Sequence, residues 1–267
     1  TIPSAGKDGI HSNGYFRMTG GSLNITSAGD GIESEKDRIS VEGGFISVVN
    51  AFADVSGIKS DSTLMVSGGT IQLTVKGNQS KGLKSGQKMT LSGGEITIAT
   101  SGGVFLKTSG SGYDPAYCAA IKSDADAEIS GSKITIGATG NGNKGISAAT
   151  DITMISGNIS IINSGNGATY KNSTGVTDSY NATCLTADRN ISITGGSLTT
   201  NSSGTGGRGI NADGTLTIGG INMSPTVHVT TTGTKFLISG TGSAAEYCEA
   251  KAIKTDGAIS IHSGTIT

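Results

Sequence analysis

Apolar residues return along this chain at fixed steps, three to a repeat. Ile58, Leu64 and Ile71 lie six and seven residues apart, and the following repeat places Leu83 and Met89 at the same six-residue step. Around these positions apolar and polar residues alternate, which is the period of a half-buried β-strand. Nine such repeats follow one another. The pattern therefore predicts three short strands in every repeat.

Equivalent positions of successive repeats form apolar columns, and the step from the second column to the third is seven residues in all nine copies. The third column comprises Leu23, Ile46, Ile71, Ile96, Ile134, Ile159, Leu198, Met223 and Ile266. A β-sandwich would instead show hairpin signals every 8 to 12 residues. Stacked coils with parallel pairing account for the constant register, and parallel crossovers favour the right hand. The prediction is an all-β, right-handed parallel β-helix of about nine coils, forming a single domain over residues 1–267.

Both corners of the predicted coil carry turn residues. A glycine pair precedes the third strand, where a positive φ is expected at the second glycine. The pairs are Gly20-Gly21, Gly43-Gly44, Gly68-Gly69, Gly93-Gly94 and Gly195-Gly196. Three residues past the first column an Asp or Asn recurs, as at Asp61 and Asp124, and we expect these side chains to cap the other turn.

Three long insertions leave the same corner, after the third strand of alternate repeats. They span about 102–118, 163–183 and 224–248. Insertions on one face of a repeat protein commonly carry its function. Five of the six tyrosines lie in or beside them and are candidate stacking platforms for sugars: Tyr113, Tyr117, Tyr170, Tyr180 and Tyr247. The alternative is that the insertions merely cover the edge of the sheet.

Composition excludes several classes of protein. A net charge of −1 with no basic block argues against a nucleic-acid partner. No apolar run is long enough to span a membrane. The three cysteines, Cys118, Cys184 and Cys248, precede coils two apart. That separation is too large for a disulfide, so buried thiols are expected.

Carboxylates occupy equivalent positions in consecutive coils. Asp8 and Asp30 lie two residues before the first column, and Asp54 lies close to its equivalent position. Like charges stacked so closely repel unless a cation lies between them, and Ca²⁺ prefers oxygen ligands. Further predicted ligands lie at the insertion edge: Asp114, Asp178 and Glu249. The alternative is a set of solvated turn carboxylates, some of them paired with lysines.

Basic residues also form columns. One residue after the first column come Lys59, Lys84 and Lys122 in consecutive coils. Two residues before it come Lys81, Lys144 and Arg208, on the adjoining corner. This basic stripe could meet an anionic polymer such as a polyuronate, so Lys59, Lys84 and Lys122 are candidate binding residues. The alternative is pairing with Asp61 or Asp124 on the same face.

The repeated pattern K-G-[IL]-K-[ST] followed by I-x-[IV]-S-G-G-x-I-x-I resembles a bacterial family of carbohydrate-binding domain-containing proteins, once catalogued as a domain of unknown function. The closest stretches are Lys81–Ile98, Tyr113–Ser123 and Tyr247–Ile261. The resemblance implies a right-handed parallel β-helix related in fold to pectate lyases, including those with a lysine base. It further implies bound calcium, a secreted or surface-attached protein, and binding of cell-wall or acidic polysaccharide without cleavage.

Three functions remain open at this point. The first is a non-catalytic, calcium-stabilised binder of cell-wall or polyuronate-type polysaccharide, located outside the cell or on the bacterial surface. The second is a calcium-dependent polysaccharide lyase acting by β-elimination, with Lys81 or Lys84 as the base. The third is a structural adhesin, for which an outward column of small polar residues such as Thr97, Thr135 and Thr199 would provide a flat face. The oligomeric state is left open.

Overall fold

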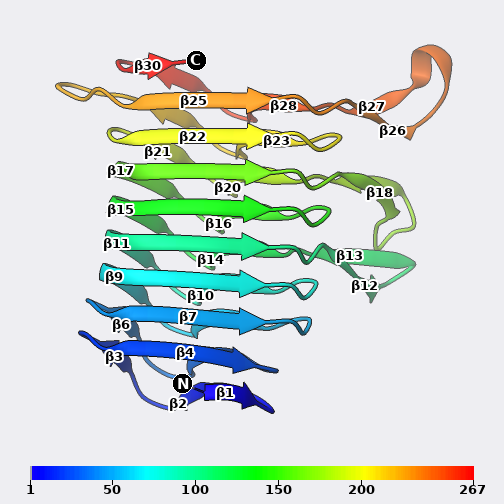
Figure 1. Cartoon of the computed structure of the whole chain (residues 1–267). Helices are drawn as coiled ribbons and strands as arrows, with labels where there is room; N and C mark the ends of the chain where they lie inside the picture. The colour runs from blue at the N-terminus through cyan, green and yellow to red at the C-terminus, as the bar shows by residue number, and fades with distance from the viewer. Residues whose placement is uncertain (1) are drawn as a thin grey trace.

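The computed structural model describes residues 2–267, with side chains from Gly6 onward, and shows a parallel β-helix. Within these residues one sheet contains nine parallel strands, one from each coil, as the sequence predicts. In order along the stack they are β2 (Ile10–Ser12), β5 (Ile32–Ser34), β8 (Ser56–Ser60), β10 (Lys81–Ser85), β14 (Ala119–Ser123), β16 (Lys144–Ala148), β20 (Thr183–Ala187), β23 (Arg208–Ala212) and β28 (Lys251–Thr255). Figure 1 shows the coils stacked from the N-terminus to the C-terminus.

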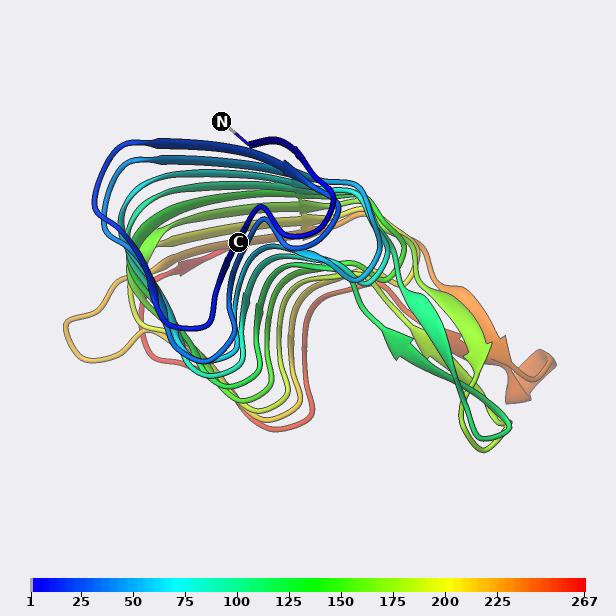
Figure 2. The ribbon, with the colours of Figure 1, turned by 90° about the horizontal axis from the view of Figure 1, so that it is seen from below.

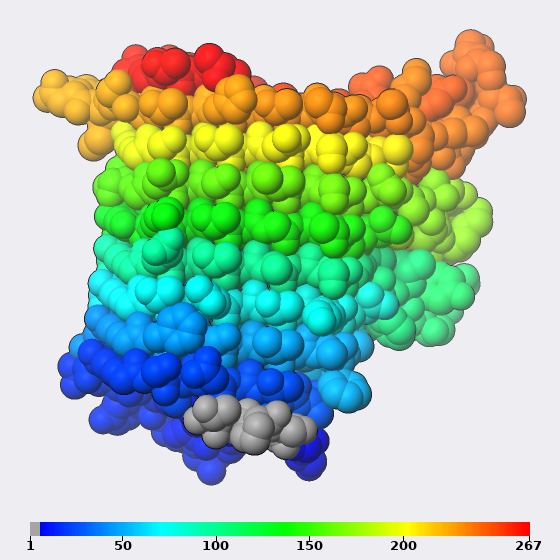
Figure 3. Space-filling model, viewed as in Figure 1, coloured from blue at the N-terminus to red at the C-terminus, as the bar shows by residue number. Residues whose placement is uncertain are grey.

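The second and third predicted strands of every coil lie in one larger sheet, whose strands are also parallel. Its members are β1 (Ile2–Ala5), β3 (Phe16–Met18), β4 (Ser22–Ser27), β6 (Ile39–Val41), β7 (Phe45–Asn50), β9 (Leu64–Val75), β11 (Met89–Thr100), β15 (Ala127–Ala138), β17 (Ile152–Asn163), β21 (Ile191–Ile193), β22 (Ser197–Ser202), β24 (Leu216–Ile218), β25 (Thr226–Thr231), β29 (Ile259–Ile261) and β30 (Thr265–Ile266). In β9, β11, β15 and β17 the two predicted strands join into one 12-residue strand. Figure 3 shows the outer face of this sheet as broad and even.

Seen from the N-terminal end, the chain turns clockwise as the coils recede, so the β-helix is right-handed (Figure 2). The corner before the third strand is made as predicted by the glycine pairs. The second glycine of each predicted pair has a positive φ, for example 82° at Gly69 and 79° at Gly94. A β-carbon at Gly94 would lie 2.8 Å from the carbonyl oxygen of Gly69 in the coil below. Both the backbone conformation and the stacking therefore require glycine there.

The apolar columns stack inside the coil and form its core. Ile58, Leu83, Ile121 and Ile146 pair in register along the nine-stranded sheet and are fully buried. The residue before each of them also turns inward, where space is short. A β-carbon at Gly82 would lie 2.7 Å from Cγ2 of Ile98. This explains the K-G-[IL]-K motif, in which the two lysines point outward and the two residues between them pack inward.

The predicted capping role at the remaining corner belongs to serine, not to aspartate. The Oγ of Ser60 accepts a hydrogen bond from the backbone N–H of Ser62, and Ser123 does the same for Ala125. Both serines are fully buried. Aspartate at the next position points outward to neighbouring lysines, so the expectation that Asp61 and Asp124 cap this turn is wrong.

The insertions fold into antiparallel hairpins, where the sequence predicted only loops. The strands are β12 (Phe105–Ser109) with β13 (Gly112–Ala116), β18 (Ala168–Lys171) with β19 (Thr177–Tyr180), and β26 (Phe236–Ser239) with β27 (Glu246–Cys248), the last joined through a short 3₁₀ turn, η1 (Gly242–Ala244). All three project from one edge of the coil stack (Figure 2). A bridge between Tyr113 and Asn172 links the first hairpin to the second. We call these hairpins the hairpin arm.

A column of glycines marks the corner from which the arm leaves. Backbone lies directly on backbone at this corner, because a β-carbon at Gly102 would come within 1.7 Å of the carbonyl oxygen of Gly77. The column continues through alternating short and long connections, and it comprises Gly77, Gly102, Gly140, Gly165, Gly204 and Gly233. The hairpins therefore begin at a corner that carries no side chains of its own.

The eighth coil departs from the predicted register. Leu198 in the coil below pairs with Val227, which is fully buried, while the predicted column member Met223 is 41% exposed. The turn between β24 and β25 is four residues longer than in the other coils. Residues 224–231, assigned from the sequence to the third insertion, accordingly include strand β25, and that insertion begins only after Thr231.

Candidate functional site

The outward face of the nine-stranded sheet carries three rows of side chains parallel to the stacking axis. The row beside the hairpin arm, the hairpin-side row, comprises Ser56, Lys81, Ala119, Lys144, Thr183, Arg208 and Lys251. The middle row comprises His11, Glu33, Lys59, Lys84, Lys122, Ser147, Thr186, Asn211 and Lys254. The far row follows the strand ends and includes Asp61, Asp124, Asp188, Asp213 and Asp256.

This face and the base of the hairpin arm enclose a cleft of about 470 Å³. Its floor contains residues of all three rows from coil 4 to coil 8. Its wall is formed by Tyr117, Ser179, Tyr180 and Asn181, which connect the hairpins to the coils. A second, smaller cavity of about 230 Å³ shares Lys81 and Lys84 with the cleft and continues toward the N-terminal coils. The sheet face is thus hollowed along several coils.

Lysines of the middle row are paired with carboxylates of the far row. Lys59 Nζ lies 3.5 Å from Asp61, and Lys84 and Lys122 lie 4.0 and 3.9 Å from Asp124. Pairing within the face, the alternative stated for these lysines, is therefore what the structure contains. Lys59, Lys84 and Lys122 remain predicted binding residues, but their charge is already partly compensated.

Three cations of the hairpin-side row, unlike the lysines of the middle row, are not paired with carboxylates among the described residues. In the described part of the chain, no carboxylate oxygen lies within 4.0 Å of the charged nitrogens of Lys81, Lys144 or Arg208. Lys144 Nζ donates to the carbonyl oxygen of Asn181 at 2.7 Å. Arg208 donates through Nη1 to Asn211 at 2.9 Å, and its buried Nε has no hydrogen-bond partner. These three cations bring uncompensated positive charge to the floor of the cleft.

The surroundings of Lys144 disfavour its charged form. Burial, together with the charge of Arg208, lowers the pKa of the Lys144 ammonium to about 7. Burial and the charge of Lys84 also lower the pKa of Lys81. Lys144 Nζ lies 4.5 Å from the centre of the Tyr117 ring, a contact that stabilises the cation. An anion in the cleft would stabilise the charged amine further.

Two of the five predicted tyrosines line the cleft, Tyr117 and Tyr180. Burial raises the pKa of Tyr117 to about 12, so it remains a neutral phenol at ordinary pH. Tyr170 lies behind Tyr180, with ring centres 6.3 Å apart, and its hydroxyl donates to Asp178 at 3.3 Å. The other two, Tyr113 and Tyr247, are more than 40% exposed and do not line the cleft.

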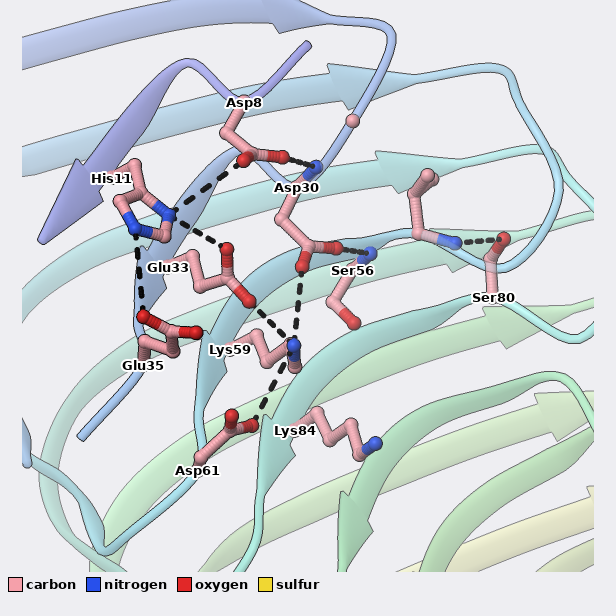
Figure 4. Close-up of polar contacts among 12 residues, drawn as sticks. Asp8, His11, Asp30, Glu33, Glu35, Ser56, Lys59, Asp61, Ser80 and Lys84 are labelled. Carbon is pink, nitrogen blue, oxygen red and sulfur yellow. Dashed lines mark hydrogen bonds and ion pairs between the residues drawn. The ribbon is translucent and has the colours of Figure 1, made fainter. Parts of the chain in front are cut away.

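At the N-terminal end of the same face, carboxylates form a hydrogen-bonded ladder (Figure 4). Asp8 accepts from the backbone N–H of Asp30 at 2.7 Å, and Asp30 in turn accepts from the backbone N–H of Ser56. Lys59 Nζ lies 3.7 Å from Asp30 and is hydrogen bonded to Glu33. Although burial opposes the charged form of Lys59, these carboxylates raise the pKa of Lys59. A lysine ammonium therefore compensates the stacked acids.

Of the predicted calcium ligands, Asp8 belongs to a compact group of possible metal ligands, with His11 and Glu33. One ligand atom from each of these three lies within 4.8 Å of the others. The remaining five predicted ligands are distributed over the molecule. Asp30 pairs with Lys59, Asp54 lines the smaller cavity, Asp114 and Asp178 lie on separate hairpins, and Glu249 lies 3.9 Å from Lys251. Calcium binding stays a prediction.

All three cysteines are buried free thiols, as expected. Burial raises the pKa of Cys118 to about 11 and that of Cys184 to about 12. Both groups are therefore uncharged and unreactive at neutral pH. The cleft chemistry rests on its cations, its phenols and its far-row carboxylates.

Comparison with known families agrees with this geometry. The profile of a family described as "Carbohydrate-binding domain-containing protein" matches residues 1–142. The chain belongs to this family. Members of a carbohydrate-binding domain family are expected to present polar and aromatic groups to a sugar, and the cleft does so. The family match ends two residues before Lys144, while the coils continue in the same register to β30.

No match was found among the curated proteins or among the solved structures. Within residues 2–267 no helix is long and apolar enough to cross a membrane. The carbohydrate-binding assignment therefore rests on the family, and the position of the site within the fold rests on the cleft geometry.

Proposed function

We propose that this carbohydrate-binding domain binds an acidic, polyuronate-type polysaccharide in the cleft, without cleaving it. The observation that supports this proposal is the hairpin-side row, where Lys81, Lys144 and Arg208 have no carboxylate partner. Cations without partners attract an anionic polymer more strongly than cations already paired. Carboxylate groups of a uronate are ligands of the required charge.

Aromatic and acidic residues of the cleft can contact the ring and the hydroxyl groups of a sugar. Tyr117 and Tyr180 offer aromatic faces against which the apolar face of a pyranose ring can pack. Asp188 and Asp213 on the opposite margin can accept hydrogen bonds from sugar hydroxyls, since an ionised carboxylate is an acceptor only. A uronate chain would thus direct its acid groups to one margin and its hydroxyls to the other.

The test is calorimetric titration with polygalacturonate and with its fully methyl-esterified form. Because the ester lacks the charge, we expect binding of the acid and at least tenfold weaker binding of the ester. Lys144→Met should lower the affinity for the acid about tenfold, which corresponds to a charge-assisted contact. Lys133→Met is the matched control, because Lys133 pairs with Glu95 on the other sheet at 2.7 Å. Equal binding of acid and ester would contradict the proposal.

We also propose that calcium stabilises the N-terminal coils and that the protein acts at the cell surface, as the family resemblance implies. Asp8 and Glu33 supply the carboxylates of the compact group that also contains His11. A thermal melt with EDTA and then with added Ca²⁺ tests the metal, because a ligand of the native state raises the midpoint by mass action. Asp8→Asn should remove the response. An identical midpoint under all conditions would refute a calcium role.

A lyase remains the second candidate, and one observation favours a particular base for it. In β-elimination a base removes the proton on the carbon next to the substrate carboxylate, and the glycosidic oxygen on the following carbon leaves. A neutral amine can act as this base, and Lys144 with its pKa of about 7 fits the role better than the paired Lys84. Prolonged incubation with polygalacturonate should produce the ultraviolet absorbance of unsaturated uronate only if this candidate is correct. Absence of that product, with binding retained, would support the non-catalytic function.

A further inference from the structure

From coil 4 to coil 8 the hairpin-side row alternates in charge and in length. The next position, in coil 9, is Lys251, which lies 3.9 Å from Glu249. Lys81, Lys144 and Arg208 belong to coils 4, 6 and 8, while the intervening coils 5 and 7 place Ala119 and Thr183 at the same position. The two short side chains are buried, with relative exposures of 2% and 1%. Within these coils the margin of the cleft therefore carries a part-buried cation in every second coil and a short neutral side chain in the coils between.

The hairpin arm has the same two-coil period. Insertions leave the stack after coils 4, 6 and 8, which are the coils that contribute the cations. Tyr117 and Tyr180, at the ends of the first two insertions, line the cleft, and the Tyr117 ring contacts Lys144. Because floor and wall repeat together, the structural unit of the cleft is a pair of coils.

The spacing of this unit can be compared with that of a glycan. Neighbouring coils are separated by roughly 4.8 Å, so equivalent atoms in every second coil are about 10 Å apart. In a polysaccharide joined through the 1 and 4 positions of its pyranose rings, each sugar adds a length roughly equal to the spacing of one coil. In an extended chain with a twofold twist, every second sugar presents its carboxylate to the same side.

We propose that the bound polysaccharide lies parallel to the stacking axis and directs the acid group of every second sugar to the hairpin-side row. Three acid groups, on the first, third and fifth sugars of a pentasaccharide, then face Lys81, Lys144 and Arg208. The second and fourth sugars pass over Ala119 and Thr183. This inference rests on the proposed function and adds the direction and register of binding.

A chain lying across the strands would be recognised less well by the same residues. Following β16 outward from the arm, it would meet Lys144, then Ser147 and then Ala149, which lies between Asp124 and Asp188 of the adjacent coils. Such a chain would contact one uncompensated cation. Only the axial direction brings an anionic polymer past several free cations.

The experiment is calorimetric titration with oligogalacturonides from the monosaccharide to the heptasaccharide. For the wild-type protein we expect affinity to rise in steps, between two and three sugars and again between four and five. Each additional cation contact is made within an already bound chain, so each step should be about tenfold or more. Little change is expected beyond five sugars.

Variants locate the steps along the axis. Lys81→Met and Arg208→Gln each remove one end of this set of three cations, so each should abolish the second step and leave the first. Lys254→Met, in the middle row, is the control and should leave both steps unchanged, since Lys254 is paired with Asp256 at 2.5 Å. Circular dichroism verifies that each variant is folded.

The possible failures can be distinguished. Affinity that rises evenly with every sugar, or that levels off at two sugars, would overturn the axial register while leaving acidic-glycan binding intact. Absence of binding at every length, with polygalacturonate also unbound, would refute the proposed function itself. Loss of both steps in the Lys254→Met control would assign recognition to the middle row and contradict the inference.

Discussion

On the outward face of the nine-stranded sheet, the lysine at the N-terminal end is paired with carboxylates, whereas two cations of the cleft have no such partner among the described residues. At the N-terminal end, Lys59 is surrounded by Asp30, Glu33 and Asp61 at ion-pairing distances. In the described part of the cleft, Lys144 and Arg208 have carbonyl, hydroxyl, amide and aromatic neighbours and no carboxylate within 4.0 Å. Lys59 belongs to the middle row and the other two cations belong to the hairpin-side row, which are neighbouring columns of the same repeat. The comparison shows that a repeated lysine stabilises the fold where carboxylates face it and is available for a ligand where they are missing.

Removing Lys59 should give the largest change in stability. Lys59→Met leaves Asp30 and Glu33 part-buried without a counter-charge, which we expect to cost about 2 kcal/mol in the free energy of unfolding. Urea unfolding measures the loss. Hydrogen exchange should place it in the first three coils, because each coil contacts only its neighbours. If hydrogen exchange in the first three coils were unchanged in Lys59→Met, the proposed difference between the stabilising Lys59 and the cations of the cleft would be wrong.

Binding should depend on pH through Lys144. The ammonium is the form that an anionic glycan stabilises, and the free amine has a pKa of about 7. Above pH 7 binding must take up a proton, so we expect affinity for polygalacturonate to fall about tenfold between pH 6 and pH 8. Titrations at a series of pH values measure this. The affinity of Lys144→Met should not depend on pH. If the variant showed the same pH dependence, a titrating group other than Lys144 would be responsible.

Tyr117 should matter more than Tyr113. Tyr117→Ala removes an aromatic face from the cleft and the ring that contacts Lys144, so we expect about fivefold weaker binding. Tyr113→Ala, on the exposed side of the first hairpin, is the matched control and should bind as the wild type does. Equal losses in both variants would show that the whole arm, rather than the cleft wall, contacts the glycan.

Lys144→Met should not destabilise the fold. Lys144 has no ion pair to lose among the described residues, and burial disfavours its ammonium, so the free energy of unfolding at pH 7 should be equal or higher in the variant. The lysine pKa is lower in the folded protein than in the unfolded chain, so the wild type should gain stability relative to the variant as pH rises from 7 to 10. A constant difference across this range would contradict the lowered pKa.

Much of the fold follows from the sequence because the core is built from columns. Ile58 and Leu83 are apolar at a fixed spacing, and stacking them leaves one register in which every coil buries the same positions. The register of the eighth coil was predicted wrongly in this way. Met223 is apolar at the expected spacing, although Gly219-Gly220 comes one residue earlier than the glycine pairs of the other coils. The lengthened turn brings Val227 into the column instead.

The site was predicted less completely. The sequence showed both columns of basic residues but assigned binding to Lys59, Lys84 and Lys122, whose carboxylate partners lie in the same coil or in an adjacent one. A local signal was present for two of them, because Asp61 and Asp124 lie two residues beyond Lys59 and Lys122. Which tyrosines reach the cleft depends on how the hairpins fold, and strand alternation in the coils does not determine that.

The glycine column at the root of the hairpin arm has a consequence for how such proteins diversify. At Gly102, Gly165 and Gly233 the chain leaves the stack from a corner where successive coils touch through bare backbone. A segment of any length can depart there without displacing a packed side chain. Hairpins could therefore be exchanged, lengthened or deleted between related proteins while the coils beneath stay the same, and selectivity for different sugars could evolve separately from the stability of the rod.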